Sequence, residues 1–159
     1  MGQKLLLTRH ATARSGAARD IERPLSTDGR VQAGILAAKL KPLIQGAIVL
    51  HSPALRAAET AQIISEGAAA DLISIDELYW GEEDEWLRLI PLTGQPTLVV
   101  GHAPSIPMAA SMIAAGEGPD LIFQRGCPTA TTYVFEVPDG LSKIGWHSCD
   151  LKDIIITPK

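Results

Sequence analysis

The N-terminal stretch Leu5-Leu6-Leu7-Thr8-Arg9-His10-Ala11-Thr12 is apolar at first and then ends on an arginine and a histidine. A short apolar run bounded by small and polar residues is typical of a buried strand in a parallel sheet. Open α/β sheets bind ligands outside the carboxyl ends of their strands. The stretch therefore predicts a strand over residues 4–8 that brings Arg9 and His10 to a ligand-binding edge.

A second stretch repeats this pattern. Residues 96–102 form an apolar run, rich in β-branched side chains, that ends on His102. Pro104 and Ser105 follow, and the next residues predict a helix as far as about residue 114. His102 is therefore expected at the same sheet edge as His10.

A third apolar run, residues 47–50, adds an arginine to this edge. It is followed by Ser52 and Pro53, the usual order of a helix N-cap and a first-turn proline. The helix predicted over residues 53–65 carries Arg56 near its beginning. We expect Arg56 to project toward the edge that holds Arg9.

The remaining segments also alternate between strands and helices. The first predicted helix begins at Ser26 or Thr27 and ends before Pro42, and its expected buried positions are Val31, Ile35, Leu36 and Leu40. We expect an edge strand at 71–75, a helix near 86–91, a loop over 117–128, and a hairpin of residues 130–137 and 143–147. This order predicts a three-layer α/β/α sandwich with a mostly parallel central sheet, formed by one domain over residues 1–159.

Charge is segregated along the chain. The net charge of −4 argues against a nucleic-acid partner, because phosphate-backbone binding needs a basic surface. An anionic ligand therefore needs a local cluster of positive charge. The first thirty residues supply such a cluster with Arg9, Arg14, Arg19, Arg23 and Arg30, whereas acidic residues gather at Asp76, Glu77 and 82–85.

Cysteine usage and the N-terminus favour a cytoplasmic protein. Cys127 and Cys149 form no C-x-x-C motif, and a chain of 159 residues needs no disulfide, so both are expected to be free thiols. No apolar leader follows Met1, and no run approaches membrane-spanning length. We expect no membrane partner, and a monomer from the small size and dispersed surface charge.

Two histidines and two arginines at one sheet edge fit a dianionic phosphoryl group. A guanidinium is a planar fork that matches phosphate oxygens, and the helix N-termini near Ser52 and Pro104 add N–H donors. The four histidines could instead hold a metal, but none lie at ligand spacing such as i, i+4, and flanking arginines repel a cation. We therefore expect no metal and no cofactor, and a structural role for His51 and His147.

Four motifs occur in order along the chain: Leu7-Thr8-Arg9-His10-Ala11, Asp20-x-x-Arg23-Pro24-Leu25-Ser26-x-x-Gly29, Ser52-Pro53-x-x-Arg56-Ala57-x-x-Thr60 and Val100-Gly101-His102-x-Pro104. Together they resemble the histidine phosphatase superfamily, which has the phosphoglycerate-mutase-like fold. Within it the chain is most similar to the small bacterial phosphohistidine phosphatases. The resemblance covers nearly the whole chain, because the ending Gly145-Trp146-x-Ser148-Cys149-x-Leu151 is also similar to theirs.

The resemblance implies a role for each matching residue. His10 is the expected nucleophile, Arg9 and Arg56 hold the phosphoryl oxygens, His102 stabilises the transferring group, and Arg23 helps to bind phosphate or substrate. The chemistry of the residues agrees, because an imidazole attacks phosphorus only through an unprotonated nitrogen and nearby guanidinium groups disfavour its protonation. Water then releases phosphate from phospho-His10.

The chain departs from the wider family in two places. Ala11 stands where glycine is usual, so a close backbone approach there requires an ordinary φ at residue 11. The wider family also uses an acidic residue to protonate an alkoxide leaving group. The sequence alone does not choose among the candidates Glu77, Glu82, Glu83 and Asp84, and we expect Asp20 to orient Arg23 or cap a turn rather than act as the acid.

The expected activity is hydrolysis of phosphohistidine on a partner protein, such as a phosphorelay component. Phosphohistidine has a better leaving group than an alkyl phosphate and needs less help from a general acid. Two alternatives stay open: a phosphatase for small phosphomonoesters, and a phosphoprotein-binding module with little turnover. A mutase is less expected, because the chain is short and lacks the inserted segments that close over a sugar-acid phosphate.

Overall fold

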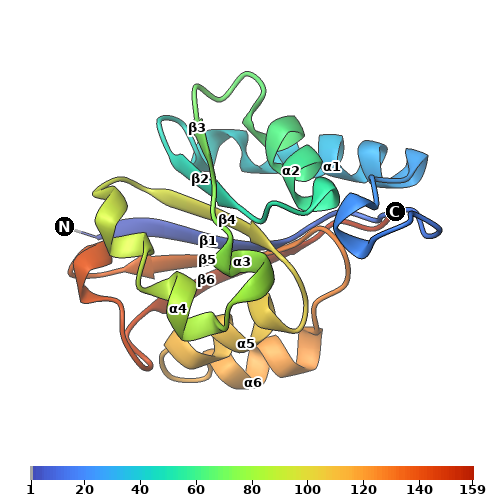
Figure 1. Cartoon of the computed structure of the whole chain (residues 1–159). Coiled ribbons are helices and arrows are strands. Elements are labelled where there is room, and N and C mark those ends of the chain that lie inside the picture. The colour runs from blue at the N-terminus through green and yellow to red at the C-terminus, as the bar shows by residue number, and fades with distance from the viewer. Residues whose placement is uncertain (1) are drawn as a thin grey trace.

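One six-stranded sheet, with strand order β3-β2-β4-β1-β5-β6, forms the centre of the molecule (Figure 1). The computed structural model describes residues 2–159 apart from Leu92. Strands β3, β2, β4 and β1 are parallel to one another, and β5 is antiparallel to both β1 and β6. The strands are β1 (Gln3–Arg9), β2 (Ile48–His51), β3 (Asp71–Ser74), β4 (Thr97–Gly101), β5 (Thr131–Val137) and β6 (Asp150–Ile156). The prediction of a mostly parallel sheet with 71–75 at its edge is confirmed.

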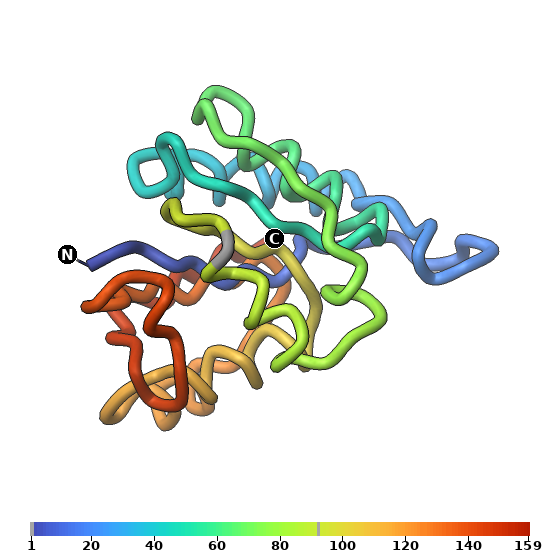
Figure 2. Tube along the Cα trace, turned by 60° about the vertical axis from the view of Figure 1, so that its left-hand side comes forward, coloured from blue at the N-terminus to red at the C-terminus, as the bar shows by residue number. Residues whose placement is uncertain are grey.

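Helices cover both faces of this sheet, as Figures 1 and 2 show from two directions. One face carries α1 (Thr27–Leu40) and α2 (Leu55–Ser65), and the other carries α3 (Glu77–Trp80), α4 (Glu83–Leu87), α5 (Ser105–Ile113) and α6 (Gly118–Arg125). Short 3-10 helices occur at η1 (Asp20–Glu22), η2 (Lys41–Leu43), η3 (Ile90–Thr93) and η4 (Leu141–Lys143). The three-layer α/β/α prediction is therefore confirmed. Within the described part of the chain, no helix has the length and apolar character needed to cross a bilayer.

The central strand β1 links the two cores. Successive side chains of a strand point to opposite faces, so Leu6 packs in the core beneath α1 and α2 while Leu5 and Leu7 pack in the core beneath α4, α5 and α6. The register pairs Arg9, the last residue of β1, with Gly101, the last residue of β4. His10 and His102 therefore leave the sheet side by side.

The buried face of α1 differs from the prediction. Val31 and Ile35 are 61% and 46% exposed, whereas Leu36 and Leu40 are buried as expected. The buried face instead follows the helical positions 29, 33, 36 and 40, beginning with Gly29 and Ala33. These small residues allow the helix backbone to approach its neighbours closely, and the larger Val31 and Ile35 stay on the outer face.

Residues 117–128 are not the predicted loop, because α6 occupies most of them. Pro119 lies within the first turn of α6, where its missing N–H costs no helical hydrogen bond. Gly116 and Gly126, with φ of 57° and 71°, lie just outside the two ends of the helix. Glycine and proline thus mark the limits of a helix here.

Two further predictions about chain segments were wrong. The partner of β5 is β6, not residues 143–147, which form the end of η4 and the turn after it. The single helix expected near 86–91 is divided into α4 and η3, with Trp86 buried in the core between sheet and helices.

The packing of α1 yields a matched pair of stability predictions. A Cβ atom added at Gly29 overlaps the backbone carbonyl of Thr12, whereas one added at Gly34 meets nothing within 4 Å. We expect Gly29→Ala to lower the free energy of unfolding by about 2 kcal/mol or more, because backbone must move. Gly34→Ala is expected to raise it by about 0.5–1 kcal/mol, since alanine favours the helix.

Urea unfolding of both variants, followed by circular dichroism, measures the two changes. A Gly29→Ala protein as stable as the wild type contradicts the close approach of α1 to the loop that follows His10.

Candidate active site

The two predicted histidines meet at the carboxyl ends of β1 and β4. The backbone N–H of His10 donates to the carbonyl oxygen of Gly101 at 2.9 Å, which ties the two strand ends together. The ring centroids of His10 and His102 are 5.2 Å apart, with 60° between the ring planes. The structure therefore brings together two residues that lie 92 positions apart in the sequence (102 minus 10).

The ring of His10 is held in one tautomer. Its Nδ1 lies 2.6 Å from the carbonyl oxygen of Ala11, and a carbonyl oxygen can only accept a hydrogen bond, so Nδ1 carries the proton. The lone pair is then on Nε2. Arg56 Nε donates to this Nε2 atom at 3.3 Å, which agrees with an unprotonated nitrogen there.

Burial keeps both histidines neutral. The pKa of His10 is lowered to about 3, first by desolvation and then by the positive charges of neighbours that include Arg56 and Arg9, although the bond to the Ala11 carbonyl opposes the shift. The pKa of His102 is lowered to about 4, again first by desolvation and next by the charge of Arg56. Burial is therefore a larger cause than guanidinium charge, the cause expected from the sequence.

These pKa values predict a loss of stability in mild acid. The two histidines have pKa values near 6.5 when unfolded and about 3 and 4 when folded, so the unfolded chain binds more protons between these values. Their contribution to stability is complete above about pH 6.5 and is lost as the pH falls toward 4. We expect a slope of up to about 1.4 kcal/mol per pH unit for each histidine.

Urea unfolding at pH 6.5 and pH 5 measures this slope. The variant with both His10→Asn and His102→Asn is expected to lose most of it. An equal slope in the wild type and this variant contradicts the lowered pKa values.

Arg56 connects His10 to the segment before α1. Its side chain is 8% exposed, and its NH1 and NH2 groups donate to the main-chain oxygen and to Oδ2 of Asp20 at 2.9 and 3.0 Å. Thr60 fixes the start of α2 beside the site, because its hydroxyl donates to the Arg56 carbonyl at 2.7 Å and accepts the N–H of Ala11 at 3.1 Å. The arginine predicted from the Ser52-Pro53 pattern thus lies directly at His10.

Ser52 has a contact that its sequence context did not reveal. The sequence predicts it as a helix N-cap, and its hydroxyl does accept the N–H of Ala54 at 3.1 Å, although α2 itself begins at Leu55. The same oxygen lies 2.8 Å from Nε2 of His102. Ser52 therefore fixes the orientation of the second imidazole, whose buried Nδ1 has no partner in the described part of the chain.

The other two predicted arginines lie around this centre. Arg9 donates from NH1 to the carbonyl oxygen of Cys127 at 2.8 Å, while its buried Nε has no partner in the described residues. Arg23 donates to Oδ1 of Asp20 at 3.0 Å and to the carbonyl oxygen of Arg14 at 2.7 Å. Arg23 is therefore joined to Arg56 through Asp20 and lies at the rim.

Asp20 orients Arg23, as expected, and also binds Arg56 and the hydroxyl of Tyr79. Its pKa is held well below the usual range by hydrogen bonds, of which the bond from Tyr79 is the largest cause and the bond from Arg23 the next. The carboxylate is therefore ionised at neutral pH and is not a proton donor.

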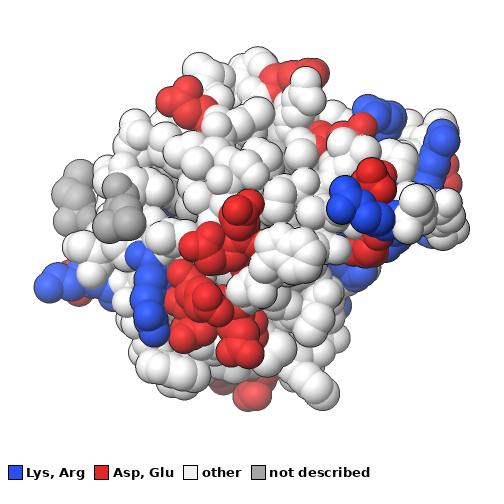
Figure 3. Space-filling view, viewed as in Figure 1, with Lys and Arg blue, Asp and Glu red and all other residues white. Residues whose placement is uncertain are grey.

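Of the candidate acids, Glu77 begins α3, Glu82 is the N-cap of α4, and Glu83 and Asp84 lie in α4. Glu82 forms the capping box of α4, Glu83 accepts from the hydroxyl of Ser105 at 3.3 Å, and Asp84 pairs with Arg88. Figure 3 shows the acidic side chains gathered over these helices, away from most of the basic ones. Within the described residues, none of the four makes a hydrogen bond or ion pair with His10, His102, Arg9 or Arg56.

Alanine at position 11 fits the backbone without strain. Among the described residues, positive φ values outside glycine occur only at Ala69, Ala130 and His147. The φ of Ala11 is therefore ordinary, and alanine fits the backbone where the wider family has glycine. The preceding residue, His10, accepts the backbone N–H of Ala130 with its carbonyl oxygen at 3.0 Å.

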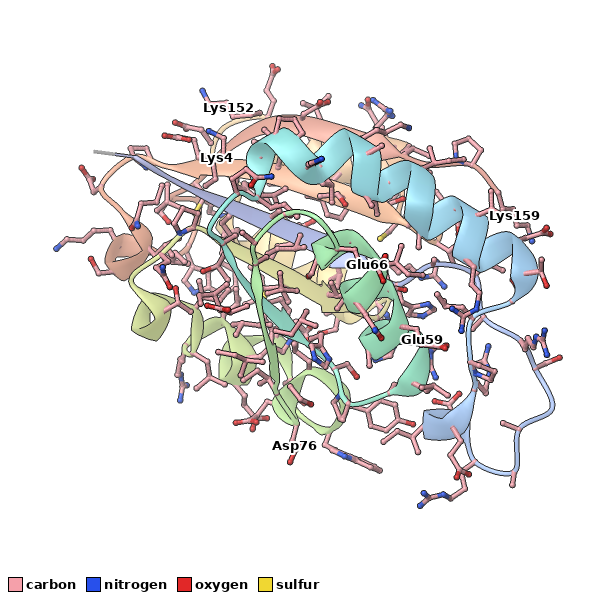
Figure 4. The ribbon with its side chains drawn as sticks, turned by 90° about the horizontal axis from the view of Figure 1, so that it is seen from above. Lys4, Glu59, Glu66, Asp76, Lys152 and Lys159 are labelled. Atoms are coloured by element: carbon pink, nitrogen blue, oxygen red, sulfur yellow. The ribbon has the colours of Figure 1, made fainter. Side chains whose placement is uncertain are left out.

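Two contacts of the site were not predicted from the sequence, one made by Tyr79 and one made by Glu59 with the loop before α1. The hydroxyl of Tyr79 donates to Asp20 at 2.8 Å, and its ring centroid lies 5.5 Å from that of His102. Glu59, labelled on α2 in Figure 4, accepts the N–H of Leu25 at 2.8 Å and pairs with Arg30, which ties the loop before α1 to α2. The Asp20-x-x-Arg23 motif was visible in the sequence, but its contact with Tyr79 depends on the folded chain.

Part of the chain matches a known protein family. Residues 5–82 match the family model of the histidine phosphatase superfamily, branch 1. No curated protein matches the sequence.

Several solved structures match over nearly the whole chain. A protein from Nakamurella multipartitia, provisionally assigned as the phosphohistidine phosphatase SixA, is 28% identical, with 100% of this chain and 98% of that chain covered and a TM-score of 0.80. A protein from Agrobacterium tumefaciens with the same provisional assignment is 26% identical, with 97% of each chain covered and a TM-score of 0.81. The protein histidine phosphatase SixA complexed with tungstate shares the fold, at 21% identity, 96% coverage of each chain and a TM-score of 0.77.

One assignment agrees with all of these observations. They are the four motifs, the paired histidines at the ends of β1 and β4, the match over residues 5–82 and the structural similarity over the whole chain. The chain belongs to the histidine phosphatase superfamily and has its phosphoglycerate-mutase-like fold.

Proposed function

We propose that this phosphatase hydrolyses protein phosphohistidine through a covalent phosphohistidine at His10. The observation that carries the proposal is the state of the His10 ring. Its Nδ1 proton is bound by the Ala11 carbonyl, and its unprotonated Nε2 lies at Arg56. The ring is therefore a neutral nucleophile next to a cation that binds phosphate well.

In the first step, Nε2 of His10 attacks phosphorus, the new N–P bond forms, and the bond to the leaving group breaks. Arg9 and Arg56 bind the equatorial oxygens, and His102 donates to the transferring group. Donors that are already oriented then stabilise the negative charge on these oxygens. This stabilisation is the main contribution of a protein to phosphoryl transfer. Arg23, at the rim, binds phosphate or the adjoining part of the substrate.

In the second step, water attacks the phosphorus of phospho-His10 and releases inorganic phosphate. The neutral imidazole of His10 returns as the leaving group. Two guanidinium groups supply the positive charge that a metal provides in other phosphatases, so we propose a metal-independent reaction and expect EDTA to leave the rate unchanged.

The choice of phosphohistidine rests on the leaving group. An alkoxide needs a proton as it leaves, but Asp20, the carboxylate bound to Arg56, is ionised. An imidazole whose second nitrogen is protonated leaves as a neutral ring and needs no proton from the enzyme. The substrate is accordingly a partner protein that carries phosphohistidine.

The experiment compares phosphate release from a phosphohistidine peptide and from p-nitrophenyl phosphate, with and without EDTA. Release that is much faster from the peptide than from p-nitrophenyl phosphate supports the proposal. Equal rates on both substrates favour a general phosphomonoesterase, and binding of the peptide without release from either favours a phosphoprotein-binding module.

A further inference from the structure

Tyr79 touches both halves of the site from outside the four family motifs. Its hydroxyl donates to Oδ2 of Asp20 at 2.8 Å, across 59 positions of sequence. Its ring lies edge-on to His102, with 5.5 Å between centroids and 74° between planes. It belongs to α3, whose N-cap Asp76 is labelled in Figure 4.

Asp20 is the point through which Tyr79 reaches the arginines. Its Oδ1 accepts from Arg23 at 3.0 Å, its Oδ2 accepts from Arg56 at 3.0 Å, and its main-chain oxygen accepts from Arg56 at 2.9 Å. The Asp20 side chain is 51% exposed, and no residue of η1 is buried. Packing therefore does not fix this carboxylate, and its position depends on its polar contacts.

The Tyr79 bond differs from the other contacts to Asp20. Arg23 is only three residues away, and Arg56 projects from α2 on one face of the sheet. Tyr79 projects from α3, which packs on the opposite face. Its hydroxyl thus ties Asp20 to a different layer of the fold. This contact opposes a movement of Asp20 together with Arg23 and Arg56.

We propose that Tyr79 is a positioning residue that holds Asp20 in place, so that Asp20 keeps the Arg56 fork at His10 and Arg23 at the rim. The proposal rests on the proposed function, in which both arginines bind the phosphoryl group. Tyr79 itself need not touch the substrate.

The protonation states of the pair suit this role. The bond to Asp20 is the largest cause that raises the pKa of Tyr79, so its hydroxyl keeps its proton and donates at neutral pH. The same bond is the largest cause that lowers the pKa of Asp20. The carboxylate therefore stays an acceptor for all its donors.

A double-mutant cycle of Tyr79→Phe and Asp20→Ala tests the proposal. Phenylalanine keeps the ring against His102 and removes only the hydroxyl. The readouts are the dissociation constant of inorganic phosphate by calorimetry, which needs no turnover, and kcat/KM for p-nitrophenyl phosphate. We expect Tyr79→Phe to raise the dissociation constant of phosphate about fivefold and to lower kcat/KM about fivefold, the effect of one lost hydrogen bond. In the Asp20→Ala background the same substitution is expected to change neither quantity.

The matched control is Trp80→Phe, the next residue on α3, which is 74% exposed and packs edge-on against the Tyr79 ring. It is expected to change neither readout. The proposal is overturned if Tyr79→Phe equals the wild type in phosphate binding and in kcat/KM. It is also overturned if the fivefold effect of Tyr79→Phe persists in the Asp20→Ala background. If the wild type binds no phosphate and has no activity, the proposed function fails and the positioning role fails with it, a result distinct from the other two.

Discussion

His10→Ala is expected to abolish turnover of p-nitrophenyl phosphate and of a phosphohistidine peptide, with kcat lower by roughly 10⁴-fold or more. The variant lacks the Nε2 atom that attacks phosphorus, and no other histidine can replace it. His102 lies 5.2 Å away by ring centroid, but its Nε2 is bound to Ser52 at 2.8 Å. Steady-state kinetics on both substrates measure the loss.

His51→Ala is the matched control for this variant. His51 is the last residue of β2, whereas His10 directly follows β1. Nδ1 of His51 lies 2.9 Å from the carbonyl oxygen of the next residue, as Nδ1 of His10 does at 2.6 Å. We expect this control to keep most of the wild-type activity. A His10→Ala protein that retains activity within about tenfold of the wild type excludes His10 as the nucleophile.

Arg56→Ala is expected to lower kcat by about 10²–10³-fold, the usual cost of removing one oriented donor to a developing anion. Its Nε lies 3.3 Å from Nε2 of His10, so the guanidinium is next to the point of attack. The loss also frees Asp20, whose Oδ2 and main-chain oxygen both accept from Arg56. We expect a smaller loss of stability to accompany the loss of rate.

Arg56→Lys separates charge from geometry. Lysine keeps the positive charge but cannot form the planar fork that reaches His10 and Asp20 together. We expect its kcat to fall between those of Arg56→Ala and the wild type, with folding checked by circular dichroism. Full activity in the lysine variant contradicts the role of the fork.

The strands that carry the site were predictable because they are buried. β1 and β4 lie between two helical layers and therefore appear as continuous apolar runs that stop at the sheet edge. β6 was missed because it is an edge strand with charged side chains such as Lys152 and Asp153, which weaken the apolar pattern. α6 was missed because the glycines and prolines around it favour a loop when read locally.

The residues of the site also divide into those that were predictable from the sequence and those that were not. His10 and His102 directly follow strands, Arg9 is the last residue of one, and Arg56 lies in the first turn of α2. The sequence motifs predicted that these four residues meet. The structure brings His10, His102 and Arg56 into direct proximity, and their catalytic roles stay predictions. The links through Ser52 to His102 and through Tyr79 to Asp20 join distant segments and have no local signal. Burial of the imidazoles, the first cause of their lowered pKa values, likewise depends on the completed fold.

In the proposed mechanism the phosphoryl group passes through Nε2 of His10. The most direct measurement mixes the enzyme with a phosphohistidine peptide, quenches it in alkali within the first turnover, and locates phosphate on the chain by mass spectrometry. We predict phosphate on the peptide that contains His10, stable to alkali and lost in acid. Phosphate on another side chain, or product formed in that turnover while His10 stays unmodified, contradicts the mechanism.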